Sequence, residues 1–118
     1  GVDCFTSYYP RPVKDRNLQT ARRHPRFEFR ELDLSADPLD GLADNVDWVF
    51  HLAAMPGLVR SWTDAGLYTR HNLLATHRLL DAVRGRPVRK FVYASTSSVY
   101  GKYASGDETL PTRPSSPY

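Results

Sequence analysis

The sequence is nearly free of cysteine, and it has no long apolar run. Its one cysteine, Cys4, excludes an internal disulfide and a cysteine-based metal cluster within these 118 residues. No stretch approaches the roughly 18 apolar residues that a membrane-spanning helix needs. Residues 1–10 lack the basic and then apolar pattern of a signal peptide. From these absences we expect a cytoplasmic protein with no membrane partner.

Lysine is also scarce, because only Lys14, Lys90 and Lys102 are lysines among sixteen basic residues. Thirteen acidic residues leave a net charge of +3. The arginine-rich groups at residues 22–26 and 84–90 could bind the phosphates of a nucleic acid, but they form no periodic stripe and have no interleaved aromatic residues. Modest clusters of this kind are usually solvated faces. We therefore expect no nucleic-acid partner and keep a basic nucleic-acid-binding module as a distant alternative.

Strand-like and helix-like segments alternate along the chain. The pattern predicts strands at residues 2–6, 27–33, 46–54 and 88–94, helices at 13–23, 38–43 and 65–84, and a loop at 95–118. Asp37 can cap a helix that starts at Pro38. Residues 46–54 are almost continuously apolar, as in a parallel strand covered on both faces. The alternation predicts an α/β fold, a doubly wound parallel sheet in three layers, α/β/α.

In such sheets ligands bind beyond the carboxyl ends of the strands. Asp3 lies at one such end, where it could hold the ribose hydroxyls of a dinucleotide or be a solvated turn aspartate. Asp33 could bind an adenine amino group or cap the next helix. Ala53 and Ala54 could let a flat cofactor approach the backbone, or simply pack tightly in the core.

Four successive hydroxyl residues, Ser95 to Ser98, follow the last predicted strand. Hydroxyl groups at that position can hydrogen-bond an alcohol or ketone during oxidation or reduction. A serine-rich turn is the alternative interpretation.

Six short motifs occur in a characteristic order at or near the predicted strand ends. They are VDCF at residues 2–5, LDL at 32–34, HLAA at 51–54, HNLLAT at 71–76, STSSVYG at 95–101 and SPY at 116–118. In this order the chain resembles the NAD-dependent epimerase/dehydratase family, the extended short-chain dehydrogenases that act on nucleotide sugars. The loop at residues 5–10 looks most like the UDP-glucuronate 4-epimerase branch. The resemblance implies NAD as cofactor, a nucleotide-sugar substrate and a homodimeric parent protein.

The resemblance also implies roles for individual residues. The cofactor-binding set would be Asp3, Asp33, Leu34, Leu52, Ala53, Ala54 and Asn72. Thr96 and Tyr118 would be catalytic, Thr96, Ser97 and Ser98 would contact the substrate, and no metal is implied. Asn72 could instead be an ordinary polar helix position, and Tyr118 a frayed terminus.

Two features of the family have no counterpart in these residues. A glycine-rich phosphate turn would precede Asp3 by about 20 residues, and a lysine would follow Tyr118 by four. We therefore expect residues 1–118 to be the interior part of a single NAD-binding Rossmann domain, a partial Rossmann-like fold without its first strand and without the C-terminal substrate domain.

The reaction is predicted from the two residues that follow Thr96. Dehydratases of the family carry an Asp-Glu pair there, whereas this chain has Ser97 and Ser98. Without a carboxylic acid, elimination lacks its proton donor, so we expect a nucleotide-sugar 4-epimerase for a UDP-hexose or UDP-hexuronate that oxidises C4 transiently with tightly bound NAD. A dehydratase or reductase of the same family, or a non-catalytic NAD-sensing protein, remains the alternative. We expect Arg60 to lie on the surface or behind the site, without a role in binding or catalysis.

Overall fold

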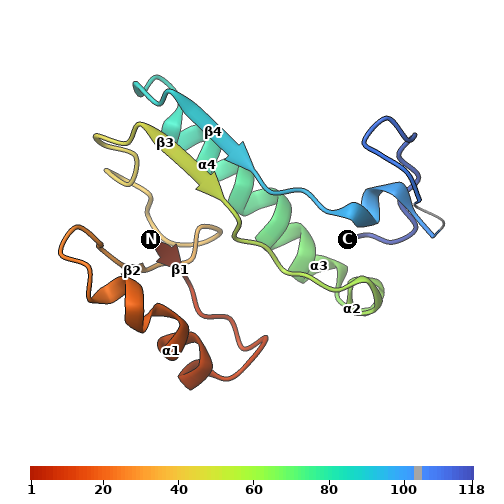
Figure 1. Cartoon of the computed structure of the whole chain (residues 1–118), viewed down its shortest axis with the longest axis horizontal. Helices are drawn as coiled ribbons and strands as arrows, with labels where there is room; N and C mark the ends of the chain where they lie inside the picture. The colour runs from red at the N-terminus through yellow and green to blue at the C-terminus, as the bar shows by residue number, and fades with distance from the viewer. Residues whose placement is uncertain (103–104) are drawn as a thin grey trace.

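The structure is a computed structural model that describes residues 1–102 and 105–118 (Figure 1). Its strands are β1 (Val2–Asp3), β2 (Arg30–Glu31), β3 (Trp48–His51) and β4 (Lys90–Tyr93). Its α-helices are α1 (Arg11–Arg22), α2 (Leu58–Thr63), α3 (Ala65–Tyr68) and α4 (Ala75–Val83). A π-helical segment, Thr69–Leu74, joins α3 to α4, and a short 3₁₀-helix spans Ser97–Tyr100. Among the described residues, every helix is too short or too polar to cross a membrane.

The strands pair in parallel, as predicted, but in two separate sheets. β1 pairs with β2, placing Asp3 opposite Glu31, and β3 pairs with β4, placing His51 opposite Tyr93. No strand of the described residues joins β1 to β3. The prediction of an α/β fold with parallel strands is confirmed, and the described strands form two separate pairs.

Helix α4 holds the two sheets together through one core. Ala75 and Leu79 on α4 cluster with Leu34, and this cluster packs against apolar side chains from both sheets and from the turn that follows β2. Those side chains are Val2, Leu32, Leu39, Leu42, Val49 and Phe91. Helix α1 is tied to the first sheet by Arg11, which donates to Glu31 on β2 through both Nη1 and Nη2 at 2.9 Å. Since Glu31 alternates in direction with Leu32, α1 and α4 lie on opposite faces of that sheet, as a three-layer fold requires.

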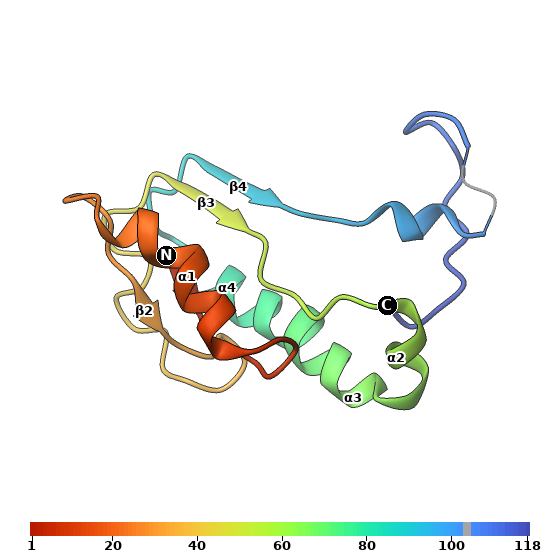
Figure 2. The same cartoon turned by 60° about the horizontal axis from the view of Figure 1, so that its bottom comes forward.

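Among the described residues, helices cover the second sheet on one face only. Figure 2 shows α3 and α4 below β3 and β4, with no described helix above them. Trp48, Phe50 and Leu52 are accordingly 50%, 63% and 70% exposed, while His51 is buried toward α4. The expectation that residues 46–54 are covered on both faces is therefore wrong for the described residues.

The predicted helix at residues 38–43 is also wrong, because residues 34–45 form successive turns. The side chain of Asp37 does not cap a helix there; it accepts a hydrogen bond from the backbone of Asp33, at 2.7 Å. Gly41 and Asn45 have φ values of 68° and 59°, which interrupt right-handed helix. A contact to a residue earlier in the chain thus replaces the local cap.

Two helical segments differ from the sequence prediction. Helix α2 was not predicted, since it follows Gly57 without a capping side chain and is only six residues long. The helix predicted at residues 65–84 is present, but its middle is the π-helical segment. A π-turn inserts an extra residue into the helix and is often found at functional sites.

Candidate functional site

The loops that follow β1, β2 and β3 line a cavity of about 270 Å³ that is open on one side, which we name the groove. Six of the seven side chains predicted to bind a cofactor line it, namely Asp3, Asp33, Leu34, Leu52, Ala53 and Ala54. The groove also includes Cys4, Lys14 and His71, for which the sequence analysis proposed no role. The carboxyl ends of parallel strands meet at one edge of a sheet, which is why residues spread over fifty positions converge.

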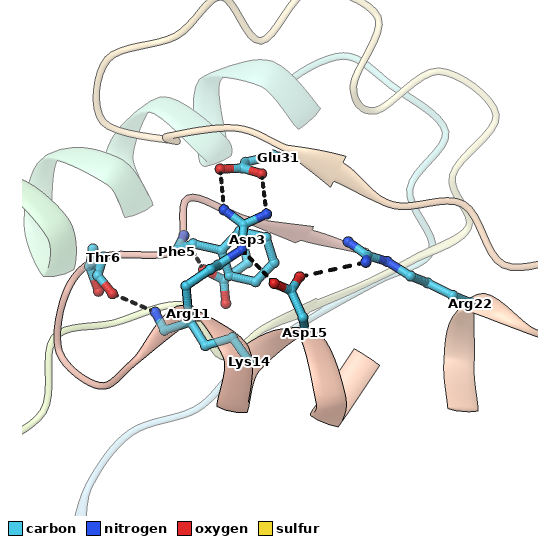
Figure 3. A network of polar contacts seen from close by, with 8 residues as sticks. All are labelled: Asp3, Phe5, Thr6, Arg11, Lys14, Asp15, Arg22 and Glu31. Atoms are coloured by element: carbon cyan, nitrogen blue, oxygen red, sulfur yellow. Dashed lines mark hydrogen bonds and ion pairs between the residues drawn. The ribbon is translucent and has the colours of Figure 1, made fainter. Parts of the chain in front are cut away.

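The Asp3 carboxylate is oriented by its own turn. Its Oδ1 accepts a hydrogen bond from the backbone N–H of Phe5 at 2.6 Å (Figure 3). Phe5 has a φ of 50°, the left-handed region, which turns the chain sharply after the strand. Within residues 1–102 and 105–118, Oδ2 of Asp3 has no hydrogen-bond partner. That oxygen is left as an acceptor for a polar group in the groove.

A buried ammonium group lies in another wall of the groove. Lys14 on α1 donates from Nζ to the backbone oxygen of Thr6 at 2.6 Å (Figure 3), and the same Nζ lies 4.8 Å from the centre of the Tyr9 ring. Figure 3 also shows Arg11 reaching both Glu31 and Asp15. These contacts tie the loop between β1 and α1 to the helix, and they place a positive charge beside the groove.

Asp33 is held as an anion at the end of β2. Its Oδ1 accepts from the backbone N–H and the hydroxyl of Ser35 at 2.8 and 2.5 Å, and its Oδ2 accepts from Nη2 of Arg70 at 2.9 Å. Burial alone would raise the pKa of Asp33, but the hydrogen bonds from Ser35 and the charges of His71 and Arg70 hold that pKa below its ordinary value. The groove therefore has a fixed negative charge at this point.

Cys4, Asp33 and His71 form a cluster whose ligand-type atoms lie within 4.8 Å of one another. Burial raises the pKa of the Cys4 thiol, and the Asp33 carboxylate raises it further, so the thiol is not activated as a ligand. The Arg70 guanidinium already supplies a positive charge to Asp33. This arrangement favours a hydrogen-bond donor from an organic ligand over a metal ion.

Asn72 supports the groove from behind. Its Oδ1 accepts from the backbone N–H of Met55 at 2.7 Å, and its Nδ2 donates to the backbone oxygen of Met55 at 3.0 Å. Because both polar groups bind the loop that follows β3, Asn72 orders the segment that presents Ala53 and Ala54. The structure thus places Asn72 behind the loop that lines the groove and not among the lining side chains.

His51 links β3 to α4 inside the core. Thr76 donates its hydroxyl proton to the backbone oxygen of Asn72 at 2.6 Å, so the same Oγ1 must accept from Nε2–H of His51 at 2.8 Å. His51 is only 3% exposed, and burial lowers its pKa below the ordinary value. The neutral ring with a proton on Nε2 fits this position.

Stability is expected to fall in mild acid because of His51. The unfolded chain takes up the His51 proton at a higher pH than the folded chain, so the stability from the neutral ring is complete above about pH 6.5 and is lost progressively below it. Urea denaturation across this range measures the free energy of unfolding. His51→Gln should flatten the pH dependence, whereas His77→Gln, at an exposed pair with Asp81, should preserve it. Equal slopes in the two variants would contradict the assignment.

The residues predicted for catalysis lie outside the groove. Thr96 caps the 3₁₀-helix by accepting the backbone N–H of Ser98 at 3.2 Å, and Ser97 and Ser98 lie in that helix. The Tyr118 ring packs edge-on against Tyr68, with 6.0 Å between centroids. Within the described residues no hydrogen bond joins Thr96 to Tyr118, and neither lines the groove. The structure brings together the predicted cofactor side chains but not this pair.

The basic groups at residues 22–26 and 84–90 contain several ion pairs. Arg84 contacts Asp81, Arg86 contacts Asp44 at 2.7 Å, and Arg89 contacts Asp47 at 3.1 Å. Arg22 likewise lies 3.6 Å from Asp15. These acidic partners reduce the positive potential that a phosphate backbone would need.

Comparison with known proteins identifies a family and several relatives of this chain. The profile of the NAD dependent epimerase/dehydratase family matches residues 8–118. The chain is 41% identical to the uncharacterized UDP-glucose epimerase YtcB of Bacillus subtilis, covering all of this chain and 38% of that protein. It is 40% identical to dTDP-glucose 4,6-dehydratase of Streptomyces griseus, covering 86% of this chain and 32% of the other.

A solved structure is similar over nearly the whole chain. It is the UDP-glucuronic acid 4-epimerase of Bacillus cereus in complex with UDP-glucuronic acid and NAD, with a TM-score of 0.91 and 38% identity. The match covers 99% of this chain and 38% of that protein. The chain therefore spans well under half the length of the proteins that it matches.

Proposed function

The chain belongs to the NAD-dependent epimerase/dehydratase family, and from this premise we propose that it is the interior part, residues 1–118, of the NAD-binding Rossmann domain of a nucleotide-sugar 4-epimerase. The single observation that carries the proposal is the convergence of Asp3, Asp33 and the 52–54 segment on one groove. We use the term complete protein for the longer polypeptide in which we propose this chain occurs.

The two separate sheets support an interior position in the domain. Rossmann sheets have the strand order 3-2-1-4-5-6, in which the second and third strands pair, as do the fourth and fifth. The pairs β1–β2 and β3–β4 correspond to these, so one further strand between β1 and β3 would join them into a continuous sheet. The bare face of β3 and β4 would then be available for helices from the rest of the domain.

The groove fits NAD by the chemistry of its lining. Asp3 would hold the adenosine ribose through the oxygen that Phe5 leaves without a partner, and Asp33 and Leu34 would bracket the adenine. Leu52, Ala53 and Ala54 would line the inner dinucleotide, with Asn72 ordering their loop through Met55. When bound, NAD would supply an acceptor for the hydride that leaves C4 of the sugar and a donor for its return to the opposite face of that carbon.

The proton chemistry is proposed for Tyr118 and Thr96. A phenol in water loses its proton near pH 10, at about its ordinary pKa, so a tyrosine base needs a positive charge nearby to work at neutral pH. In the proposed mechanism Tyr118 accepts the proton of the sugar 4-hydroxyl and later returns it, while the Thr96 hydroxyl hydrogen-bonds the reacting oxygen. For these roles the two side chains would have to approach each other in the complete protein.

Ser97 and Ser98 support epimerisation over elimination, since neither can supply an acidic proton to a leaving hydroxyl. With Thr96 they offer three hydroxyl groups to the substrate, which suits a hexose or the carboxylate of a hexuronate. A 4,6-dehydratase is the second candidate, favoured by the 40% identity to the Streptomyces griseus enzyme.

The product of the reaction tests the proposal. The complete protein, incubated with UDP-glucose or with UDP-glucuronate, should yield an isomer of unchanged mass that is inverted at C4, measured by mass spectrometry and NMR. A product that has lost one water would support the dehydratase and overturn the epimerase. Absence of any change in either sugar, despite NAD binding, would favour the NAD-sensing alternative.

A further inference from the structure

The π-helical segment directs successive side chains to different parts of the groove. Arg70 contacts Asp33 and Ser35 at the end of β2, His71 lines the groove, and Asn72 holds Met55 after β3. Arg70 and Asp33 are 37 positions apart in the chain. The motif HNLLAT drew attention to Asn72 but carried no signal for Arg70.

Arg70 completes a set of donors around the Asp33 carboxylate. A carboxylate offers about four acceptor positions, two on each oxygen. Ser35 fills two on Oδ1 with its N–H and hydroxyl, and Nη2 of Arg70 fills one on Oδ2 at 2.9 Å. Nε of Arg70 also donates to the Ser35 hydroxyl at 2.8 Å, so the guanidinium bridges both partners. In the part of the chain that the structure describes, no second donor reaches Oδ2, so one acceptor position on that oxygen remains for a ligand.

We propose that Arg70 is a positioning residue that determines base specificity: by fixing Asp33, it makes the groove select a purine with an exocyclic amino group, adenine, over hypoxanthine. This inference rests on the proposed function, because it concerns the adenine end of NAD. A fixed acceptor matches the amino group of adenine. Hypoxanthine presents an oxygen at that place and an N–H beside it, and an Asp33 carboxylate free to rotate could accept from that N–H instead.

The selection depends on fixation and not on charge alone. Without the guanidinium, the Asp33 carboxylate would keep Ser35 as a partner on Oδ1 but could pivot about that oxygen, so that Oδ2 would lose its fixed direction. Hydrogen bonds to charged groups contribute about tenfold to hundredfold to an equilibrium, and discrimination of that order is lost when the acceptor can follow the donor.

Arg78 provides a matched control on the same helical stretch. It donates to the backbone oxygens of Leu34 and Asp37 at 2.8 and 2.7 Å. It therefore supports the same loop as Arg70, with a guanidinium of the same kind, but among the described residues its hydrogen bonds go to Leu34 and Asp37 and not to Asp33. A purely structural role for Arg70 would be shared by Arg78.

The experiment compares dissociation constants for NAD and for nicotinamide hypoxanthine dinucleotide, by calorimetry on the complete protein freed of bound nucleotide. The unmodified protein should prefer NAD by about tenfold or more. Arg70→Met should bring the ratio close to one, Arg70→Lys should give an intermediate ratio, and Arg78→Met should keep the preference. Circular dichroism verifies that each variant folds, and Arg70→Lys carries the test if Arg70→Met does not.

The outcomes separate the two proposals. If the unmodified protein binds neither dinucleotide, the proposed function fails, and the role of Arg70 fails with it. If NAD binds and the preference persists in the Arg70 variants, or falls equally in Arg78→Met, only the role of Arg70 is overturned.

Discussion

Replacement of Tyr118 by phenylalanine in the complete protein is expected to lower turnover by a factor of about 10²–10⁴, the contribution of a well-placed general base. NAD affinity should stay unchanged, since Tyr118 does not line the groove. The substitution removes one hydroxyl and keeps the ring that packs against Tyr68. Turnover and the dissociation constant for NAD, measured on the same preparation, separate loss of the proton acceptor from loss of the site.

Tyr93→Phe is the matched control for that experiment. Tyr93 lies at the end of β4, is 53% exposed, and also offers a phenol whose ring packs on a neighbour, His51. Turnover of this variant should equal that of the unmodified protein. Normal turnover in Tyr118→Phe, or an equal loss in both variants, would refute the role proposed for Tyr118.

Residues 1–118 expressed alone should neither bind NAD tightly nor convert a nucleotide sugar. The groove supplies groups for the adenosine and the inner dinucleotide, but the pyrophosphate of a Rossmann ligand is normally bound at a helix N-terminus after a glycine-rich turn. Helix α1, which follows β1, begins after Pro10, and no glycine-rich turn leads into it. Calorimetric titration with NAD, beside the complete protein in the same buffer, measures the difference.

The isolated chain should also expose an apolar face that promotes self-association. Trp48, Phe50 and Leu52 lie on the uncovered side of the second sheet, where Val92 is opposite Phe50. Exposed patches of this kind bind hydrophobic dyes and promote association.

Tight NAD binding by the isolated chain in the calorimetric titration would show that the groove needs no further residues. It would overturn the proposal that residues 1–118 are an interior part of the domain.

Much of the candidate site could be predicted because its signals are local. Asp3, Asp33 and Ala53 were each predicted at or near the end of a strand-like run, and strand ends are recognisable from short windows of sequence. Parallel pairing then places those ends at one edge. The predicted helix at residues 38–43 is wrong for the opposite reason. Asp37 is a residue type that caps helices, but its side chain accepts a hydrogen bond from the backbone N–H of Asp33, which no local pattern indicates.

The sequence by itself determined the alternation of strands and helices, the parallel pairing and the candidates Asp3, Asp33, Ala53 and Ala54, because periodicity and strand ends are properties of neighbouring residues. Only the tertiary structure decided that Arg70 holds Asp33, that Asn72 holds Met55 and that no described helix covers one face of the second sheet. Those contacts join residues 17 and 37 positions apart. They depend on how α4 and the π-helical segment pack against both sheets, which no short window of sequence specifies.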